Sequence, residues 1–305
     1  MQITRPVFII GSYRGGTSLL LRLLSESEEL WSLYRESNHL WQNYHRNKEE
    51  SSDTVILEKQ TDGTFKNLLD NKIYSEPQKA RKAFDKHYHY SSYDNYALGY
   101  LGRVRTLRDK LRPLFDLINI FNYLYKLLKI NTKTYRVVDK TPPNIYRIEY
   151  LKALYPDAKF IYLVRDKEAN VKSLISAWTH PKKFVYAYRK YLTEDLDINI
   201  AGYSGKVWKF YIPPDFQNYL DKSIREICEH QYDDAHHHAK QAFKNLETND
   251  FLEIKFEDFM HGPDQIMQKI CDFTEIKYST KMKSIVKAMP VVNSDLKNNK
   301  MQSYA

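Results

Sequence analysis

The sequence predicts an α/β domain in which a parallel β-sheet is flanked by helices. Three short, mainly apolar runs carry this prediction, because each is typical of a strand and each precedes a turn and a helical pattern. The runs begin at Val7, Tyr135 and Lys159. With 305 residues and no stretch that resembles a linker, the chain is expected to form a single domain over residues 1–305.

The first run opens a predicted strand, glycine turn and helix. Val7–Ile10 is apolar throughout, the glycines between Gly11 and Gly16 allow a turn without steric penalty, and leucines recur at helical spacing over Thr17–Leu24. At such a junction, the first turn of the helix directs free N–H groups and the positive end of its dipole at the loop. The stretch therefore predicts an anion site.

The spacing of this loop nearly repeats the phosphate-loop pattern G-x-x-x-x-G-K-[ST]. Gly11, Gly16 and Ser18 stand at matching positions, but Thr17 replaces the lysine, and Arg14 inside the loop supplies a cation instead. A purely structural turn is the simpler alternative. The combination of glycines, an arginine and two hydroxyls favours the anion site, in a sheet of the phosphate-loop type.

Leu30–Tyr34 predicts a second short strand, with Glu36 and His39 just beyond it. Ligands of parallel α/β sheets bind outside the carboxyl ends of the strands, so these side chains are expected near the glycine loop. Both are candidates for acid–base work. An exposed glutamate and a loop histidine without function remain equally open for each residue taken alone.

Residues 44–134 form a long polar and aromatic segment without a clear strand, and we expect a mostly helical insertion there. Apolar residues recur three or four positions apart over Leu111–Ile130, which indicates core packing. An insertion of this size beside a site often carries substrate contacts, although most of its residues are expected to be structural cover.

The second run predicts a strand at Tyr135–Val138, and Lys140 follows just beyond the carboxyl end of this strand. Two prolines then stop the strand, and a helix is expected over Ile145–Tyr155. Lys140 is thus placed at the edge of the sheet where the glycine loop is expected. A salt-bridged surface lysine is the alternative.

The third run, Lys159–Val164, predicts a buried parallel strand that Arg165 ends. Asp166 is expected to cap the following helix, and Asn170 and Ser173 share one helix face with it. Arg165 and Ser173 can then converge on one anion, the arginine through its forked donors and the serine through its hydroxyl.

The remaining chain predicts mainly helices and one late strand. Trp178–Lys244 is helical in pattern with glycine and proline interruptions, and its consecutive histidines 236–238 point to different helix sides, which disfavours a shared metal. Phe251–Phe256 alternates as a strand, and Ile266–Phe273 predicts a closing helix. The polar tail Val291–Ala305 is expected to order with ligand bound.

Composition adds weaker constraints. Lysine and arginine total 47 against 38 aspartates and glutamates, a net charge of +9 (47 − 38), which suits an anionic ligand, nucleic acid or a membrane surface. The basic residues are scattered, and we expect no signal peptide and no membrane span. Cys228 and Cys271 lie far apart and form no metal-type pair, which favours a reduced, cytoplasmic setting.

Taken together, these stretches resemble the nucleotide-dependent sulfotransferases, in particular their bacterial and Golgi-like branch. These enzymes use 3'-phosphoadenosine 5'-phosphosulfate (PAPS) as donor. Arg14–Leu20 is similar to the family's R-S-G-T-T/S-L-L loop, with Gly15 where serine is usual, and Ser173 follows the strand-ending arginine by eight residues, as in the family's 3'-phosphate signature. Asp139–Pro142 and Leu252–Phe259 also look like segments of that branch.

The resemblance assigns donor-binding roles to seven residues. It implies that the 5'-phosphosulfate is held by the loop and the 3'-phosphate by two residues after the third run. The loop residues are Arg14, Gly15, Gly16, Thr17 and Ser18, and the 3'-phosphate residues are Arg165 and Ser173.

The resemblance also implies the catalytic set. Arg14 and Lys140 stabilise charge on the transferred sulfuryl group and on the leaving phosphate oxygen, and Glu36 takes the acceptor's proton, with His39 as the second candidate. Sulfuryl transfer is mostly positioning and electrostatic stabilisation of an in-line displacement, so side-chain cations suffice and no metal is expected. The products are then adenosine 3',5'-bisphosphate (PAP) and a sulfated acceptor.

The expected activity is therefore sulfuryl transfer from PAPS to a hydroxyl or amine of a small molecule or glycan. The alternatives are a Mg²⁺-dependent phosphate-loop kinase of a small metabolite and, in another class, a basic nucleic-acid-binding protein, for which Lys79–Tyr100 is only loosely basic. We expect no nucleic-acid partner. The sequence identifies neither the acceptor nor the oligomeric state, and a dimer is compatible with it although no stretch argues for one.

Overall fold

The structure is a computed structural model, and it describes residues 2–32, 36–37, 134–180, 198–200, 203–205, 208–210 and 216–289. His39, the tail from Val291 and the predicted insertion, apart from Thr134, lie outside these residues. What is described includes the segments that carry the motifs.

A five-stranded parallel sheet forms the centre of the fold, in the order β3-β5-β2-β6-β9. The predicted α/β class is therefore confirmed. A short parallel pair and an antiparallel hairpin lie outside this sheet. The strands of the sheet are β2 (Val7–Ile10), β3 (Trp31–Ser32), β5 (Val137–Lys140), β6 (Lys159–Val164) and β9 (Phe251–Lys255). The others are β1 (Gln2–Ile3), β4 (Thr134–Tyr135), β7 (Ile198–Ile200) and β8 (Tyr203–Gly205).

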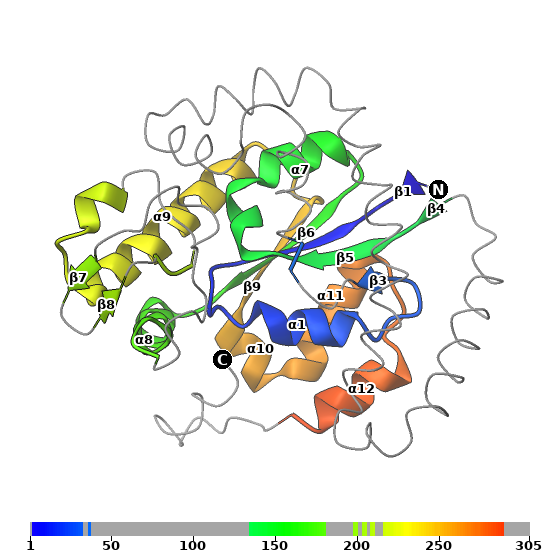
Figure 1. The fold of residues 1–305 in the computed structure, drawn as a ribbon. Helices are drawn as coiled ribbons and strands as arrows, with labels where there is room; N and C mark the ends of the chain where they lie inside the picture. The colour runs from blue at the N-terminus through cyan, green and yellow to red at the C-terminus, as the bar shows by residue number, and fades with distance from the viewer. Residues whose placement is uncertain are drawn as a thin grey trace, which may run out of the picture.

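Helices cover both faces of the sheet (Figure 1). One face is covered by α1 (Thr17–Leu24), α10 (Phe256–His261), α11 (Pro263–Thr274) and α12 (Thr280–Lys287). The other is covered by α7 (Ile148–Leu154), α8 (Lys167–Trp178) and α9 (Ile224–Lys244). Two 3₁₀ helices, η2 (Pro142–Tyr146) and η4 (Phe216–Tyr219), complete the described elements.

Alternate residues of the strands belong to the two cores. Val7 and Ile9 of β2 pack with α1, whereas Phe8 and Ile10 pack with the layer of α7 and α9. Because both faces are covered, β2 is apolar at every position instead of at every second one, and so is β6 after Lys159. This is why the continuous apolar runs identified the strands.

Several boundaries differ from the sequence-based expectation. The strand predicted to end at Val138 continues to Lys140, because the buried Asp139 is hydrogen-bonded where it lies. The helix expected over Ile145–Tyr155 is divided into η2 and α7. The β7–β8 hairpin lies where a helical pattern was expected, and the glycines at 202 and 205 explain why a helix is disfavoured there.

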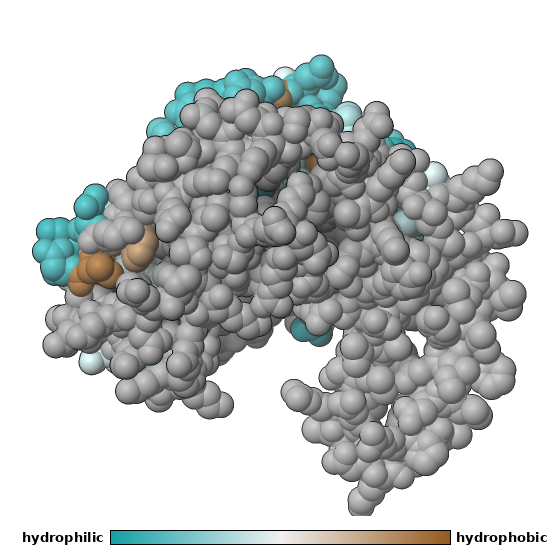
Figure 2. Space-filling view, turned by 45° about the horizontal axis from the view of Figure 1, so that its top comes forward, coloured by the Kyte–Doolittle hydropathy of each residue, from teal (hydrophilic) through white to brown (hydrophobic). Residues whose placement is uncertain are grey.

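The surface of the face drawn in Figure 2 is mainly hydrophilic where described residues reach it, with one small hydrophobic area. None of the described helices is long and apolar enough to cross a bilayer.

We predict that Gly16→Ala lowers the free energy of unfolding by about 2–5 kcal/mol. This is the sum of the cost of a left-handed backbone at a non-glycine residue and the cost of overpacking a neighbouring side chain. Gly16 has φ 87°, and a Cβ there would collide with the ring of Phe256. Urea unfolding measures the free energy. The control is Gly262→Ala, whose Cβ would meet no atom closer than 3.9 Å. Equal stability of the two variants would contradict the tight approach of the loop to Phe256.

Candidate active site

The candidate site lies at the carboxyl ends of the sheet strands. The loop 11–16 follows β2, Lys140 ends β5, Arg165 follows β6 and Phe256 follows β9. Because the strands are parallel, these residues meet at one edge of the sheet, and Ile9 of β2 lies opposite Lys140 in the register. From β2 the chain passes β5 to form β3, and after β5 it crosses β2 to form β6 on the other side. The strand order therefore reverses at β2, and ligands of parallel α/β sheets bind at such a topological switch point.

The loop after β2 brings its backbone close to its neighbours. A Cβ on Gly11 would lie 2.8 Å from the carbonyl oxygen of Leu163, and one on Gly15 would lie 2.9 Å from the carbonyl oxygen of Ser12. Gly16 is the N-cap of α1, and no side chain caps the first N–H groups of that helix. The loop therefore presents backbone donors at a place where side chains are excluded.

Arg14, Arg165 and Ser173 are brought together, although they come from the loop, the end of β6 and the middle of α8. The Nη1 of Arg165 donates to the carbonyl oxygen of Arg14 at 2.8 Å, and the Nε of Arg14 donates to the Oγ of Ser173 at 3.1 Å. Arg14 has φ 64°, a left-handed conformation that a non-glycine residue rarely adopts. Two guanidinium groups and a hydroxyl thus share one corner, and such groups can bind an anion.

Arg165 is buried at 5% exposure beneath this corner. The ring of Phe256 lies 5.2 Å from the carbon of its guanidinium group, and the hydroxyl of Tyr232 donates to its carbonyl oxygen at 2.7 Å. Burial lowers the pKa of Arg165, and the nearby Arg14 lowers it further while Glu257 raises it. Its buried Nε has no hydrogen-bond partner among the described residues.

Asn170 connects α8 to the loop. Its Nδ2 donates to the Oγ of Ser12 at 3.0 Å and to the carbonyl oxygen of Tyr13 at 3.2 Å, and the residue is fully buried. Asp166 caps α8 as expected, because its carboxylate accepts from the N–H of Ala169. The helix that carries Ser173 is thereby fixed against the loop.

Lys140 and Glu36 form the second group of the site. The Nζ of Lys140 lies 2.9 Å from the Oε1 of Glu36, and the two side chains are 8% and 33% exposed. A largely buried ammonium therefore faces a partly accessible carboxylate. Of the hydroxyl residues in the loop, Thr17 is buried and Ser18 is exposed.

The sequence did not indicate Phe256 and Tyr232 as residues of the site, and it did not indicate that Asn170 binds the loop. Phe256 is apolar and Tyr232 lies in a long helical pattern, so neither carries a signal of its own. Asn170 shares a helix face with Ser173, and its position there was the one available signal.

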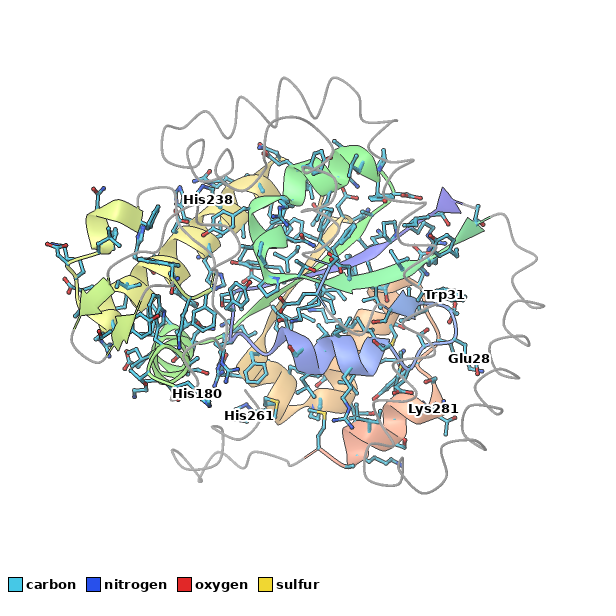
Figure 3. All side chains as sticks on the ribbon, in the orientation of Figure 1. Glu28, Trp31, His180, His238, His261 and Lys281 are labelled. Carbon is cyan, nitrogen blue, oxygen red and sulfur yellow. The ribbon has the colours of Figure 1, made fainter. Side chains whose placement is uncertain are left out.

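Among the described residues, the remaining titratable groups form no second centre. Burial lowers the pKa of His236 to about 4, and its Nδ1 lies 2.5 Å from the hydroxyl of Tyr162. His238, labelled on α9 in Figure 3, pairs with Asp234 at 3.4 Å. Burial also raises the pKa of Cys271 to about 12. No group of three or more His, Cys, Asp or Glu residues in the described segments is arranged to hold a metal ion.

Comparison with protein families identifies the chain. The model of the sulfotransferase family matches residues 6–212, more than half of the 305 residues. The chain belongs to the sulfotransferase family. It is therefore an enzyme of sulfuryl transfer, and the matched range includes the loop, Lys140, Arg165 and Ser173. A comparison with curated protein sequences found no match.

Solved structures that this sulfotransferase resembles include three of low identity. The sulfotransferase domain from the curacin biosynthetic pathway is 15% identical, with 92% of this chain and 77% of that chain covered and a TM-score of 0.47. A sulfotransferase from Alicyclobacillus acidocaldarius is 14% identical, with coverage of 93% and 91% and a TM-score of 0.41. A retinol dehydratase in complex with retinol and PAP is 17% identical, with coverage of 94% and 65% and a TM-score of 0.35.

We predict that Asn170→Asp lowers the free energy of unfolding of the sulfotransferase by about 2–3 kcal/mol at pH 8. The variant replaces the donor that faces Ser12 and the carbonyl of Tyr13 with a buried carboxylate. Part of the loss should be recovered at pH 5, because a protonated carboxyl can donate again. Urea unfolding at the two pH values measures this.

The matched control is Asn245→Asp, since Asn245 makes an exposed hydrogen bond of 2.7 Å to Glu149. Its effect is expected to stay within about 0.5 kcal/mol, as is usual at the surface. A similar cost for both variants would show that Asn170 does not hold α8 against the loop.

Proposed function

We propose that this sulfotransferase uses PAPS as donor and transfers its sulfuryl group to a hydroxyl or amine of a small molecule or glycan. The observation that carries the proposal is the convergence of Arg14, Arg165 and Ser173 beside the uncapped first turn of α1. Two separate anionic groups of one ligand suit an arrangement in which donors come from both a loop and a neighbouring strand end.

The described residues fit a nucleotide with a phosphate at each of two positions. The buried Nε of Arg165 has no partner within the described residues, so a hydrogen-bond donor remains for an anion. The N–H of Gly15 donates to the carbonyl oxygen of Ser12 at 3.1 Å, so the N–H groups of Gly16, Thr17 and Ser18, at the uncapped start of α1, are the donors proposed to hold the 5'-phosphosulfate. The 3'-phosphate is then expected at Arg165 and Ser173.

The bound donor supplies an activated sulfuryl group with PAP as leaving group, and the protein supplies charge and position. Lys140 and Arg14 are proposed to stabilise negative charge on the transferred group and the leaving phosphate oxygen. Glu36 is proposed to take the proton of the acceptor as its oxygen or nitrogen bonds to sulfur. His39, the second candidate for this proton, lies outside the described residues.

The pairing of Lys140 with Glu36 supports this division of roles. The 2.9 Å ion pair places a proton acceptor next to a cation, so the group that takes the acceptor's proton and the group that stabilises the transferred charge are adjacent. The 33% exposure of Glu36 leaves its carboxylate accessible to an acceptor. No metal is needed in this scheme, because the cations are side chains.

The phosphate-loop kinase alternative gains no support. Thr17 occupies the position of the lysine that such kinases place on the β- and γ-phosphates, and the family match is to sulfotransferases.

We predict that PAP raises the melting temperature of the protein in the presence of EDTA and binds measurably by calorimetry. Arg165→Gln should weaken that binding at least about 30-fold, since truncating a buried charge pair costs roughly 2 kcal/mol or more. The control is Arg225→Gln, an exposed arginine that pairs with Glu168 and Glu229 away from the site.

A wild-type protein that ignores PAP but binds ATP with Mg²⁺ would favour the kinase and reject PAPS as donor. Salt-dependent binding of an oligonucleotide without any effect of PAP would favour a nucleic-acid-binding protein instead.

A further inference from the structure

Asp139 is the one acidic residue of the described chain that is buried, at 1% exposure. It precedes Lys140 at the end of β5 and belongs to none of the roles assigned above. Burying a carboxylate costs free energy that an apolar residue in the same place would avoid. Because Asp139 lies next to the Lys140–Glu36 pair, its burial is best explained by a role in positioning that pair.

Side chains from three positions around Asp139 donate to its carboxylate. The Oδ2 atom accepts from the Oγ of Ser37 at 3.1 Å and from the Nδ2 of Asn144 at 2.8 Å. The Oδ1 atom accepts from the Oγ1 of Thr141 at 3.3 Å. One carboxylate thus joins the end of β5, the start of η2 and the 36–37 segment.

The backbone beside Glu36 is fixed by the same group of residues. The N–H of Ser37 donates to the Oγ1 of Thr141 at 2.7 Å, and the two hydroxyl oxygens lie 2.8 Å apart. Successive side chains of a strand point to opposite sides. Two consecutive residues of β5 therefore bind two consecutive residues of the segment, Lys140 with Glu36 and Asp139 with Ser37.

The electrostatic surroundings of Asp139 are simple. Burial raises the pKa of Asp139 to about 6, although its hydrogen bonds and the charge of Lys140 act in the opposite direction. Within the described residues, Lys140, the next residue of the strand, is the charged group that acts on Asp139, and the Nη1 of Arg147 donates to the Oδ1 of Asn144 at 3.3 Å. Asn144 of η2 and Ser37 are uncharged, Phe8 opposite on β2 is apolar, and Glu36 is held at Lys140.

We propose that Asp139 is a positioning residue: its ionised carboxylate holds Ser37 and Thr141 so that Glu36 and Lys140 meet in the geometry that transfer requires. The inference rests on the proposed function, because it assigns the carboxylate to the placement of the proton acceptor. Asp139 touches neither donor nor acceptor, and it acts through Ser37 and Thr141. Misplacement of a reacting group by about 1 Å can cost roughly a hundredfold in rate, so such placement matters.

Two variants test the role. Asp139→Asn keeps the shape and removes the charge, and Thr141→Val keeps the shape and removes the oxygen that accepts from the N–H of Ser37. Each should lower kcat at pH 8 at least about tenfold while leaving PAP affinity unchanged, since the loop, Arg165 and Ser173 are untouched. The control is Asp234→Asn, a carboxylate on α9 that accepts from Tyr146 at 2.6 Å, and its kcat should match that of the wild type.

The pH profile provides the readout that a merely structural role would not change. Wild-type kcat is expected to fall as the pH drops through about 6, because Asp139 then takes up a proton. Asp139→Asn should lack the step near pH 6 and keep its low kcat through that part of the range. If Asp139→Asn does not fold, the unchanged PAP affinity and lowered kcat of Thr141→Val carry the test.

The outcomes separate this inference from the function on which it rests. If the wild type transfers no sulfuryl group from PAPS to any acceptor, both fall together. If the wild type is active and a folded Asp139→Asn keeps its kcat and its acid limb, or loses PAP affinity in proportion to kcat, the positioning role is overturned while the function stands.

Discussion

The close approach of the loop 11–16 to its neighbours is the constraint on which the site depends. Leu163 of β6 and Phe256 of α10 leave no room for a Cβ at Gly11 or Gly16, so the backbone itself forms this wall of the site. That approach exposes the first N–H groups of α1 and lets Arg165, at the end of β6, reach the carbonyl oxygen of Arg14. The proposed anion site thus depends first on the path of the backbone and only then on side-chain chemistry.

Around this loop, the two strands that flank β2 supply the two groups of the candidate site. β6 and α8 supply Arg165 and Ser173, and β5 supplies Lys140 with its partner Glu36. This arrangement matches the proposed donor, which has two anionic groups: one contributes binding energy, and the other carries the sulfuryl group that is transferred. Each group is supported by one buried polar residue. Asn170 is hydrogen-bonded to Ser12 and Tyr13 of the loop, and Asp139 is hydrogen-bonded to Ser37, next to Glu36.

Much of this could be predicted from the sequence because the signals are local. The run Lys159–Val164 and Asp166, which caps the next helix, were placed correctly, since a strand buried on both faces is mainly apolar and an N-cap aspartate directly precedes its helix. The glycines and Arg14 likewise indicated the loop from spacing alone. The match of the sulfotransferase family model confirms the family that these motifs resemble.

What could not be predicted depends on distances across the fold. The contact of Phe256 with Arg165 joins residues far apart in sequence, and nothing in an apolar residue indicates it. Asp139 was expected to leave its strand, since a carboxylate in a core is rare, and only its three donors explain its burial. The β7–β8 hairpin was missed because its two segments are only three residues each and lie within a helical pattern.

The central claim is that one donor nucleotide lies across both groups of the site, and a crystal structure with PAP grown in EDTA tests it most directly. The account predicts density for the 3'-phosphate between Arg165 and Ser173 and for the 5'-phosphate on the N–H groups of Gly16 to Ser18, with no metal between them. PAP bound away from the loop, or a 5'-phosphate held through a metal ion, would contradict it.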